Sequence, residues 1–180
     1  MRIVGGTLGG RVLRAPHGAT TRPTSEKVRQ AIFNILGPIE GAHVLDLFAG
    51  SGALGIEALS RGAARATFVD AGKPALAAIR ANLRELGLED RAEVLAIDAV
   101  AAAGRPPAAP WQVVFVDPPY ASDLARRAVT ALPPASLAPG ARVVIEHDRR
   151  GIPPEALGSL LRTDQRRYGD TMVSFFEVPA

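Results

Sequence analysis

Residues 44–55 read Val44-Leu45-Asp46-Leu47-Phe48-Ala49-Gly50-Ser51-Gly52-Ala53-Leu54-Gly55. An apolar run, typical of a buried parallel strand, passes into a turn of small residues and then into a segment typical of a helix. The glycines follow the pattern G-x-G-x-x-G, and their missing side chains let a nucleoside approach the backbone closely. This stretch therefore predicts a strand–turn–helix unit at a nucleoside-binding site.

Alternating strands and helices follow this stretch along the chain. Short apolar runs predict buried strands at His43–Phe48, Ala66–Asp70, Ala92–Ile97, Val113–Asp117 and Arg142–Glu146. Helices are predicted at 53–62, Pro74–Leu86 and 124–132, and the stretch Ala99–Pro110 is predicted to be a loop. Arg162–Tyr168 and Met172–Val178 are typical of an antiparallel hairpin. We expect an α/β fold, a doubly wound Rossmann-like sheet that is mostly parallel with an antiparallel edge hairpin.

The first 40 residues differ from the rest in pattern and charge. They carry six basic and two acidic residues, whereas the whole chain has a net charge of only +3. A glycine-broken stretch predicts a hairpin or an arm, and a helix capped by Thr24 or Ser25 follows it up to Gly37-Pro38. We interpret 1–40 as an N-terminal extension and 41–180 as the main domain. A basic extension suits contacts to a phosphate backbone, although a solvated face would have the same composition.

The composition limits the classes of protein to consider. With 180 residues, 47% of them hydrophobic, the chain is long enough for one domain with a real core. No apolar run is long enough to span a membrane and no secretory signal is evident, so we expect a cytoplasmic protein. The chain has no cysteine and only three scattered histidines, which excludes disulfides and thiolate chemistry and makes a metal cofactor unexpected.

Three aspartates at successive strand ends narrow the choice of ligand. Asp46 lies within the first strand, where it would repel a pyrophosphate but suits a ligand with an ammonium and a sulfonium, which favours S-adenosylmethionine over NAD. Asp70 can accept the ribose hydroxyls, and Asp98 can accept a hydrogen bond from the adenine amine. Each of the latter two could instead cap the following helix.

The segment Asp117-Pro118-Pro119-Tyr120 follows a buried strand. The carboxyl end of such a strand lies at the ligand crevice, and the prolines hold the local backbone rigid. Asp117 and the carbonyl of Pro118 could accept the two hydrogens of an exocyclic base amine, which favours the pyramidal nitrogen that attacks a methyl group. Tyr120 could stack on a base turned out of its helix.

These motifs resemble those of class I amino-methyltransferases. The front segment, with Arg22-Pro23-Thr24 and 27–36, and Tyr168-Gly169-Asp170-Thr171 near the end are similar to the RsmD family, which methylates guanine N2 in 16S ribosomal RNA. The resemblance implies catalysis at Asp117, Pro118, Pro119 and Tyr120. It implies contacts to S-adenosylmethionine at the residues Asp46, Phe48, Ala49, Gly50, Ser51, Gly52, Asp70, Asp98 and Ala99. It implies RNA contacts from the basic residues Arg11, Arg22, Lys27 and Arg29, although Arg29 could instead face the cofactor carboxylate.

The sequence is compatible with several functions. The preferred partner is 16S ribosomal RNA or an assembling small subunit, the product is S-adenosylhomocysteine, and a monomer is expected. The chemistry fits N6-adenine methylation in DNA or RNA equally well. An NAD-dependent oxidoreductase would use the same glycine loop but lacks an evident proton donor, and an RNA-binding module without catalysis would not need Asp117. Trp111 is interpreted as a core or rim residue and Glu146 as a structural acid at a strand end.

Overall fold

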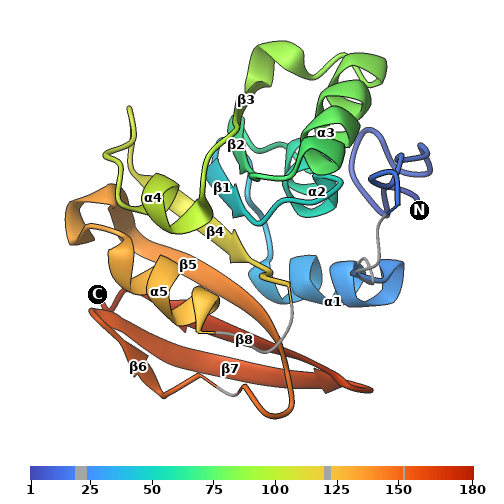
Figure 1. Ribbon diagram of the computed structural model, residues 1–180. Coiled ribbons are helices and arrows are strands. Elements are labelled where there is room, and N and C mark those ends of the chain that lie inside the picture. Colours follow the sequence, from blue (N-terminus) through green and yellow to red (C-terminus); the bar gives the residue numbers. More distant parts are fainter. Residues whose placement is uncertain (19–23, 120–122, 152) are drawn as a thin grey trace.

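The protein folds around one eight-stranded sheet. A computed structural model describes residues 1–18, 24–119, 123–151 and 153–180 (Figure 1). The strand order is β3-β2-β1-β4-β5-β8-β7-β6. The five strands from β3 to β5 pair in parallel, and β8, β7 and β6 continue the sheet in antiparallel pairing.

The helices are α1 Glu26–Leu36, α2 Ala53–Ser60, α3 Lys73–Glu85, α4 Ala99–Ala103 and α5 Leu124–Ala131, with short 3₁₀ turns at Glu89–Arg91 and Pro134–Ser136. The strands are β1 His43–Leu47, β2 Arg65–Val69, β3 Ala92–Leu95, β4 Trp111–Val116, β5 Leu137–Asp148, β6 Ala156–Leu157, β7 Leu160–Tyr168 and β8 Thr171–Glu177.

The predicted fold class is confirmed, with two local corrections. The prediction of a loop over the whole of Ala99–Pro110 is wrong, because α4 occupies its first turn and the Asp98 side chain accepts a hydrogen bond from the Ala101 N–H as the helix cap. The fifth strand is much longer than Arg142–Glu146, since β5 runs from Leu137 to Asp148. β8 pairs with it in seven residue pairs, from Arg142 to Asp148, of which only the last two lie beyond the predicted strand.

Two hydrophobic cores lie on opposite faces of the sheet. One joins α1, α2 and α3 with the sheet around Phe68 and Phe115, and the other joins α4, α5 and β6 around Val114 and Phe176. Figure 1 shows the two helix layers on either side of the central strands. Central strands such as β4 are almost wholly apolar because side chains on both of their faces are buried.

The N-terminal residues form an arm that joins the first core. The arm contains a single β-bridge, between Arg2 and Val12, so it is not a regular hairpin. Ile3 and Leu13 are buried in the same core as α1, which ties the arm to the body of the fold. Within the described ranges, no helix has the length and hydrophobicity needed to cross a bilayer.

Candidate active site

A pocket of about 1120 Å³ opens at the carboxyl ends of β1, β2, β4 and β5. The chain winds outward from β1 to β3 in one direction and from β4 to β5 in the other, so β1 and β4 flank the switch point where ligands bind in open α/β sheets. Typical small-molecule pockets enclose roughly 300–1,000 Å³. This one therefore has room for a nucleoside cofactor together with part of a second substrate.

Most of the predicted site residues meet in this pocket. It is lined by every predicted cofactor residue except Gly52, and by Asp117, Pro118 and Pro119. Gly52 has a left-handed backbone (φ 82°), and a Cβ there would face Ile56, Phe68 and Ile79, so this glycine shapes the turn from the core side. The predicted catalytic residue Tyr120 lies outside the described residues.

The loop after β1 is held in an unusual backbone conformation. Phe48 has φ 58°, the one left-handed non-glycine residue in the described chain, and Gly50 follows with φ 60°. The Ala49 N–H donates to the Val69 carbonyl at 2.9 Å, and the Gly50 N–H donates to Asp70 at 2.9 Å. A Cβ on Gly50 would meet nothing within 4 Å, so the backbone here is open to a ligand.

Asp46 is a buried carboxyl at the base of the pocket, with 1% of its surface exposed. It accepts a hydrogen bond from the Gly55 N–H at 3.0 Å, and a Cβ on Gly55 would lie 2.4 Å from the Phe68 ring. Burial raises the pKa of Asp46 to about 8, and nearby Asp70 adds to this rise while the Gly55 hydrogen bond opposes it. A positively charged ligand beside Asp46 would favour its ionised form.

Asp70 and Asp98 hold backbone groups as well as lining the pocket. The two carboxylate oxygens of Asp70 accept hydrogen bonds from the Gly50 and Gly72 N–H groups, both at 2.9 Å. Each oxygen retains a further lone pair that a ribose hydroxyl could use. Asp98 caps α4 through one oxygen and is exposed.

Asp117 and Glu146 form a pair of carboxyls in the pocket, joined by Thr24. The Thr24 hydroxyl lies 2.5 Å from an oxygen of Glu146 and 3.2 Å from an oxygen of Asp117. Burial and the Glu146 charge raise the pKa of Asp117 well above its usual range, and burial also raises the pKa of Glu146. Two desolvated carboxyls that contact the same hydroxyl each disfavour ionisation of the other.

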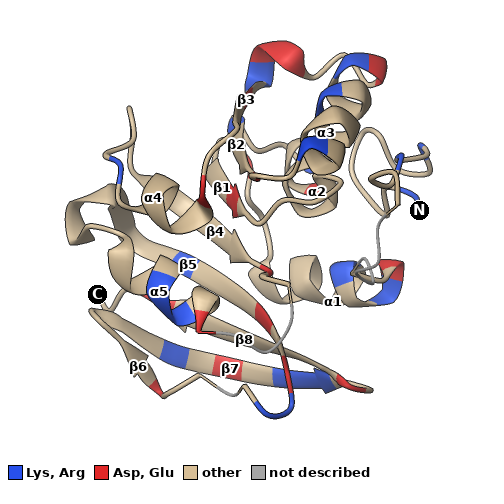
Figure 2. Cartoon of the chain, viewed as in Figure 1, with Lys and Arg blue, Asp and Glu red and all other residues tan. Residues whose placement is uncertain are grey.

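The pocket is strongly acidic. Among its described lining residues are seven carboxyl groups and no lysine or arginine. Figure 2 shows acidic residues at the ends of β1, β4 and β5, and basic residues on the outer helices and on β7. Such a pocket attracts a cation and repels a phosphate backbone.

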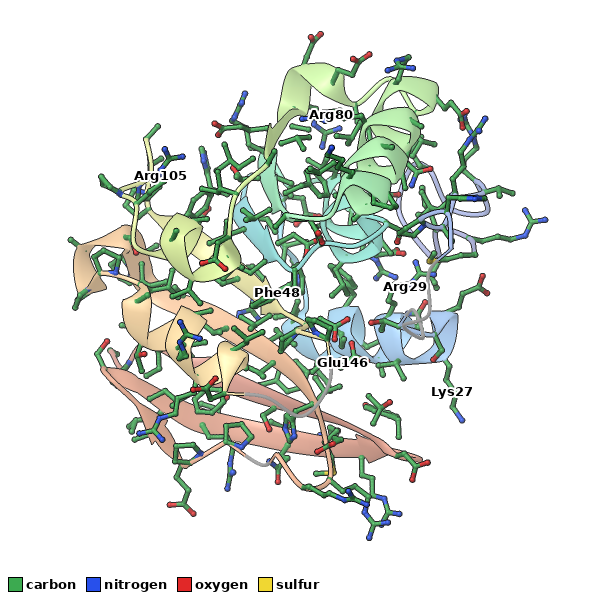
Figure 3. The ribbon with its side chains drawn as sticks, viewed as in Figure 1. Lys27, Arg29, Phe48, Arg80, Arg105 and Glu146 are labelled. Atoms are coloured by element: carbon green, nitrogen blue, oxygen red, sulfur yellow. The ribbon has the colours of Figure 1, made fainter. Side chains whose placement is uncertain are left out.

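The described basic residues that were expected to contact RNA differ in burial. Arg29 is wholly buried, and its guanidinium donates to Glu57 at 3.0 Å and to the Arg2 carbonyl at 2.7 Å. The prediction that Arg29 contacts RNA or the cofactor is therefore wrong. Its guanidinium instead links α1 to α2 and to the arm. Lys27 and Arg11 are exposed, and Figure 3 shows Lys27 pointing away from α1. Arg22 lies outside the described residues.

Glu146 and Thr24 line the pocket, and the sequence analysis did not predict either of them as a site residue. Glu146 was interpreted as a structural acid, but it lies in the pocket beside Asp117, and Figure 3 shows it with Phe48 near the centre of the molecule. The usable signal was its place at the end of the strand next to β4 in the sheet. Trp111 is partly buried against the second core, as expected.

The fold and this pocket define a class I methyltransferase. The sequence matches the family described as Conserved hypothetical protein 95 over residues 1–177. It is 40% identical over 183 residues to "Putative rRNA methyltransferase YlbH" of Bacillus subtilis (strain 168), covering 98% of each chain. It is also 37% identical to "Ribosomal RNA small subunit methyltransferase D" of Haemophilus influenzae, covering 83% of this chain and 79% of the relative. The chain therefore belongs to this family, the RsmD family.

Solved structures agree with this assignment. "Putative methyltransferase yhhF from Escherichia coli" superimposes with a TM-score of 0.87 at 34% identity, covering 100% of this chain and 98% of that one. An RNA methyltransferase from Salinibacter ruber, solved with S-adenosyl-L-homocysteine, shares the fold with a TM-score of 0.66 at 20% identity, covering 88% of this chain and 94% of that one.

Proposed function

We propose that this protein transfers a methyl group from S-adenosylmethionine to the exocyclic N2 of a guanine in 16S ribosomal RNA of the small subunit. The proposal is supported by the names of its relatives, which are ribosomal RNA methyltransferases. The single observation that carries it is that the Asp117-Pro118-Pro119 loop and the glycine loop line the same pocket. A methyl donor held by one loop could touch an amine held by the other.

The residues present fit the cofactor. Gly50 leaves open space beside the loop, the buried Asp46 favours a cation, and Asp70 keeps lone pairs for the ribose hydroxyls. Asp98 and Ala99 line the end of the pocket proposed for adenine. The cofactor would supply an electrophilic methyl group on a sulfonium.

Asp117 is proposed to hold and activate the amine. Its carboxyl and the Pro118 carbonyl would accept the two N–H groups of the base, which draws the nitrogen toward the pyramidal form with a free lone pair. As the new N–C bond forms, the nitrogen becomes positive. A neighbouring carboxylate stabilises that charge and takes up the proton that the nitrogen then releases.

The RNA would lie across the rim, with only the target base inside. The acidic pocket repels phosphates, so backbone contacts are assigned to the exposed basic residues Arg11 and Lys27 outside it, together with Arg22. A base inside a helix has to turn out of the stack to reach Asp117. We expect the protein to act as a monomer.

The test is methylation in vitro with labelled S-adenosylmethionine. Small subunits from a strain lacking the gene should accept label, and nucleoside mass spectrometry should identify N2-methylguanosine. Methylation of DNA or of adenine N6 instead would overturn the proposed substrate. A melting temperature raised by NAD but not by S-adenosylhomocysteine would overturn the enzyme class.

A further inference from the structure

We infer that Glu146 binds the N1–H of the target base and so selects guanine over adenine. The inference rests on the proposed function and deepens it, because the Asp-Pro-Pro loop can hold an amine of either base. It gives Glu146 a role in substrate specificity that is separate from the activation of the amine by Asp117.

The position of Glu146 carries the inference. It lies on β5, next to β4 in the sheet, and it lines the pocket together with Asp117. The Thr24 hydroxyl reaches both carboxyls, at 2.5 Å and 3.2 Å, which fixes them side by side. A base whose amine reaches Asp117 presents N1 to Glu146 when its N1 side faces β5, and this is the orientation that we infer.

The two candidate bases differ at that adjacent atom. In guanine the N2 amine is next to N1–H, a donor, whereas in adenine the N6 amine is next to N1, an acceptor. A pair of carboxyls offers acceptors to both positions of the guanine edge. Adenine would instead place its N1 lone pair opposite a carboxylate oxygen. Both atoms are acceptors, so no hydrogen bond would form between them.

The contact between the two carboxyls is compatible with this role. In addition to burial, contact with Glu146 raises the pKa of Asp117, whereas contact with Asp117 opposes the rise in the pKa of Glu146, so Glu146 is the acceptor of the pair. Each carboxyl oxygen has two lone pairs. The Thr24 hydroxyl contacts one oxygen of Glu146, which leaves acceptor capacity on this carboxyl toward the pocket. Among the described lining residues no lysine or arginine competes for it.

A purely structural Glu146 would behave differently on substitution. Loss of a structural acid would lower the methylation of every substrate in the same proportion. Loss of a residue that contacts N1–H would lower methylation of guanine and spare a base that has the N2 amine but no N1–H. 2-Aminopurine is such a base, so it separates the two roles.

The experiment uses 16S RNA, assembled into small subunits, with either guanine or 2-aminopurine at the target position found by mass spectrometry. The wild type should prefer guanine in kcat/KM by at least about 100-fold, because a site built around a donor rejects an analogue that lacks it. In Glu146→Gln the guanine value should fall about 10- to 100-fold while the 2-aminopurine value holds or rises. The missing O6 of 2-aminopurine affects both proteins alike and cancels in the comparison.

Glu177→Gln is the matched control, since Glu177 ends β8 outside the pocket and should leave both values unchanged. The melting temperature and the affinity for S-adenosylhomocysteine verify that Glu146→Gln is folded and binds cofactor. An unchanged guanine preference in Glu146→Gln, with lower values for both bases, would overturn the inference. No methylation of any base by the wild type would instead overturn the proposed function. Should Glu146→Gln fail to fold, a wild type that methylates the two bases equally well would overturn the inference on its own.

Discussion

Asp46 is a carboxyl that the fold holds out of water, and its titration should be visible in stability. Burial raises its pKa in the folded protein to about 8 from an ordinary value of 3.8. An acid with a raised folded pKa favours the folded state while it is protonated, so this contribution is complete below about pH 4 and is lost as the pH rises through about 8. In Asp46→Asn the fall of stability with pH between pH 5 and 8, measured by denaturant unfolding, should be shallower, because this contribution is gone while those of Asp117 and Glu146 remain. Equal slopes of stability against pH in both proteins would contradict the assignment.

Asp117 should be needed for chemistry but not for cofactor binding. Asp117→Ala removes the acceptor of the amine hydrogens, and methyl transfer should fall by at least about 100-fold, as for the loss of one preorganised electrostatic group. The affinity for S-adenosylhomocysteine should stay within a few fold, because the cofactor residues lie on other strands. Radiolabel transfer and calorimetry measure the two quantities. A loss of cofactor affinity as large as the loss of rate would assign Asp117 to cofactor binding instead.

Individual residues were predictable from sequence only where their chemistry was local. The strand-end acids Asp46, Asp70 and Asp117 were predicted because strand, turn and carboxyl are neighbours in the chain. Thr24 and Glu146 are separated by 122 positions and meet only through the sheet order, so no local pattern joins them. The prediction that Arg29 contacts RNA or the cofactor was wrong for the same reason, because its partner Glu57 is also distant in sequence.

Among the elements, α1, α2 and the arm are joined by one buried charge cluster. Glu57 accepts hydrogen bonds from the Val4 and Gly5 N–H groups at 2.9 and 2.8 Å and pairs with Arg29 and Arg61. The Arg61 guanidinium also lies over the Phe33 ring, 4.9 Å from its centroid. The cluster fixes the start of α1, and with it the position of Thr24 in the pocket.

Arg29→Ala should destabilise the fold by about 3–5 kcal/mol, because it removes the fully buried cation that pairs with the buried Glu57. The free energy of unfolding in urea measures this. Arg80→Ala, an exposed arginine on α3 (Figure 3), is the control and should stay within about 0.5 kcal/mol of the wild type. A change of similar size in the two variants would contradict the role assigned to the cluster.

Elements with a clear period were predicted well, and those that depend on tertiary pairing were not. The central strands and α3 follow directly from runs and spacing of apolar residues. The first half of β5 contains Pro139-Gly140, which locally indicates a turn, yet it extends the sheet beside β4 and Trp111. The helix α4 has only five residues, and Ala99, Ala102 and Ala103 are buried in the second core, which no local propensity indicates.

At the scale of the molecule, charge is divided between an acidic pocket and a basic exterior. If Arg11 and Lys27 contact phosphates, each alanine substitution should lower the magnitude of the slope of log K for RNA against log salt concentration by roughly 0.7–0.9. Fluorescence anisotropy with labelled RNA at several salt concentrations measures this slope. Arg105→Ala, exposed on the loop after α4, should leave the slope unchanged. If Arg105→Ala changes the slope as much as the other two do, the binding surface is not where we propose it.

The seven carboxyls around the pocket also bear on turnover. Methyl transfer removes the positive charge from the sulfur of the methyl donor. The demethylated product is therefore attracted less strongly to the acidic pocket than the donor is. A new donor molecule should therefore displace the product readily. Product inhibition should be weaker than in an enzyme with a neutral pocket of the same shape.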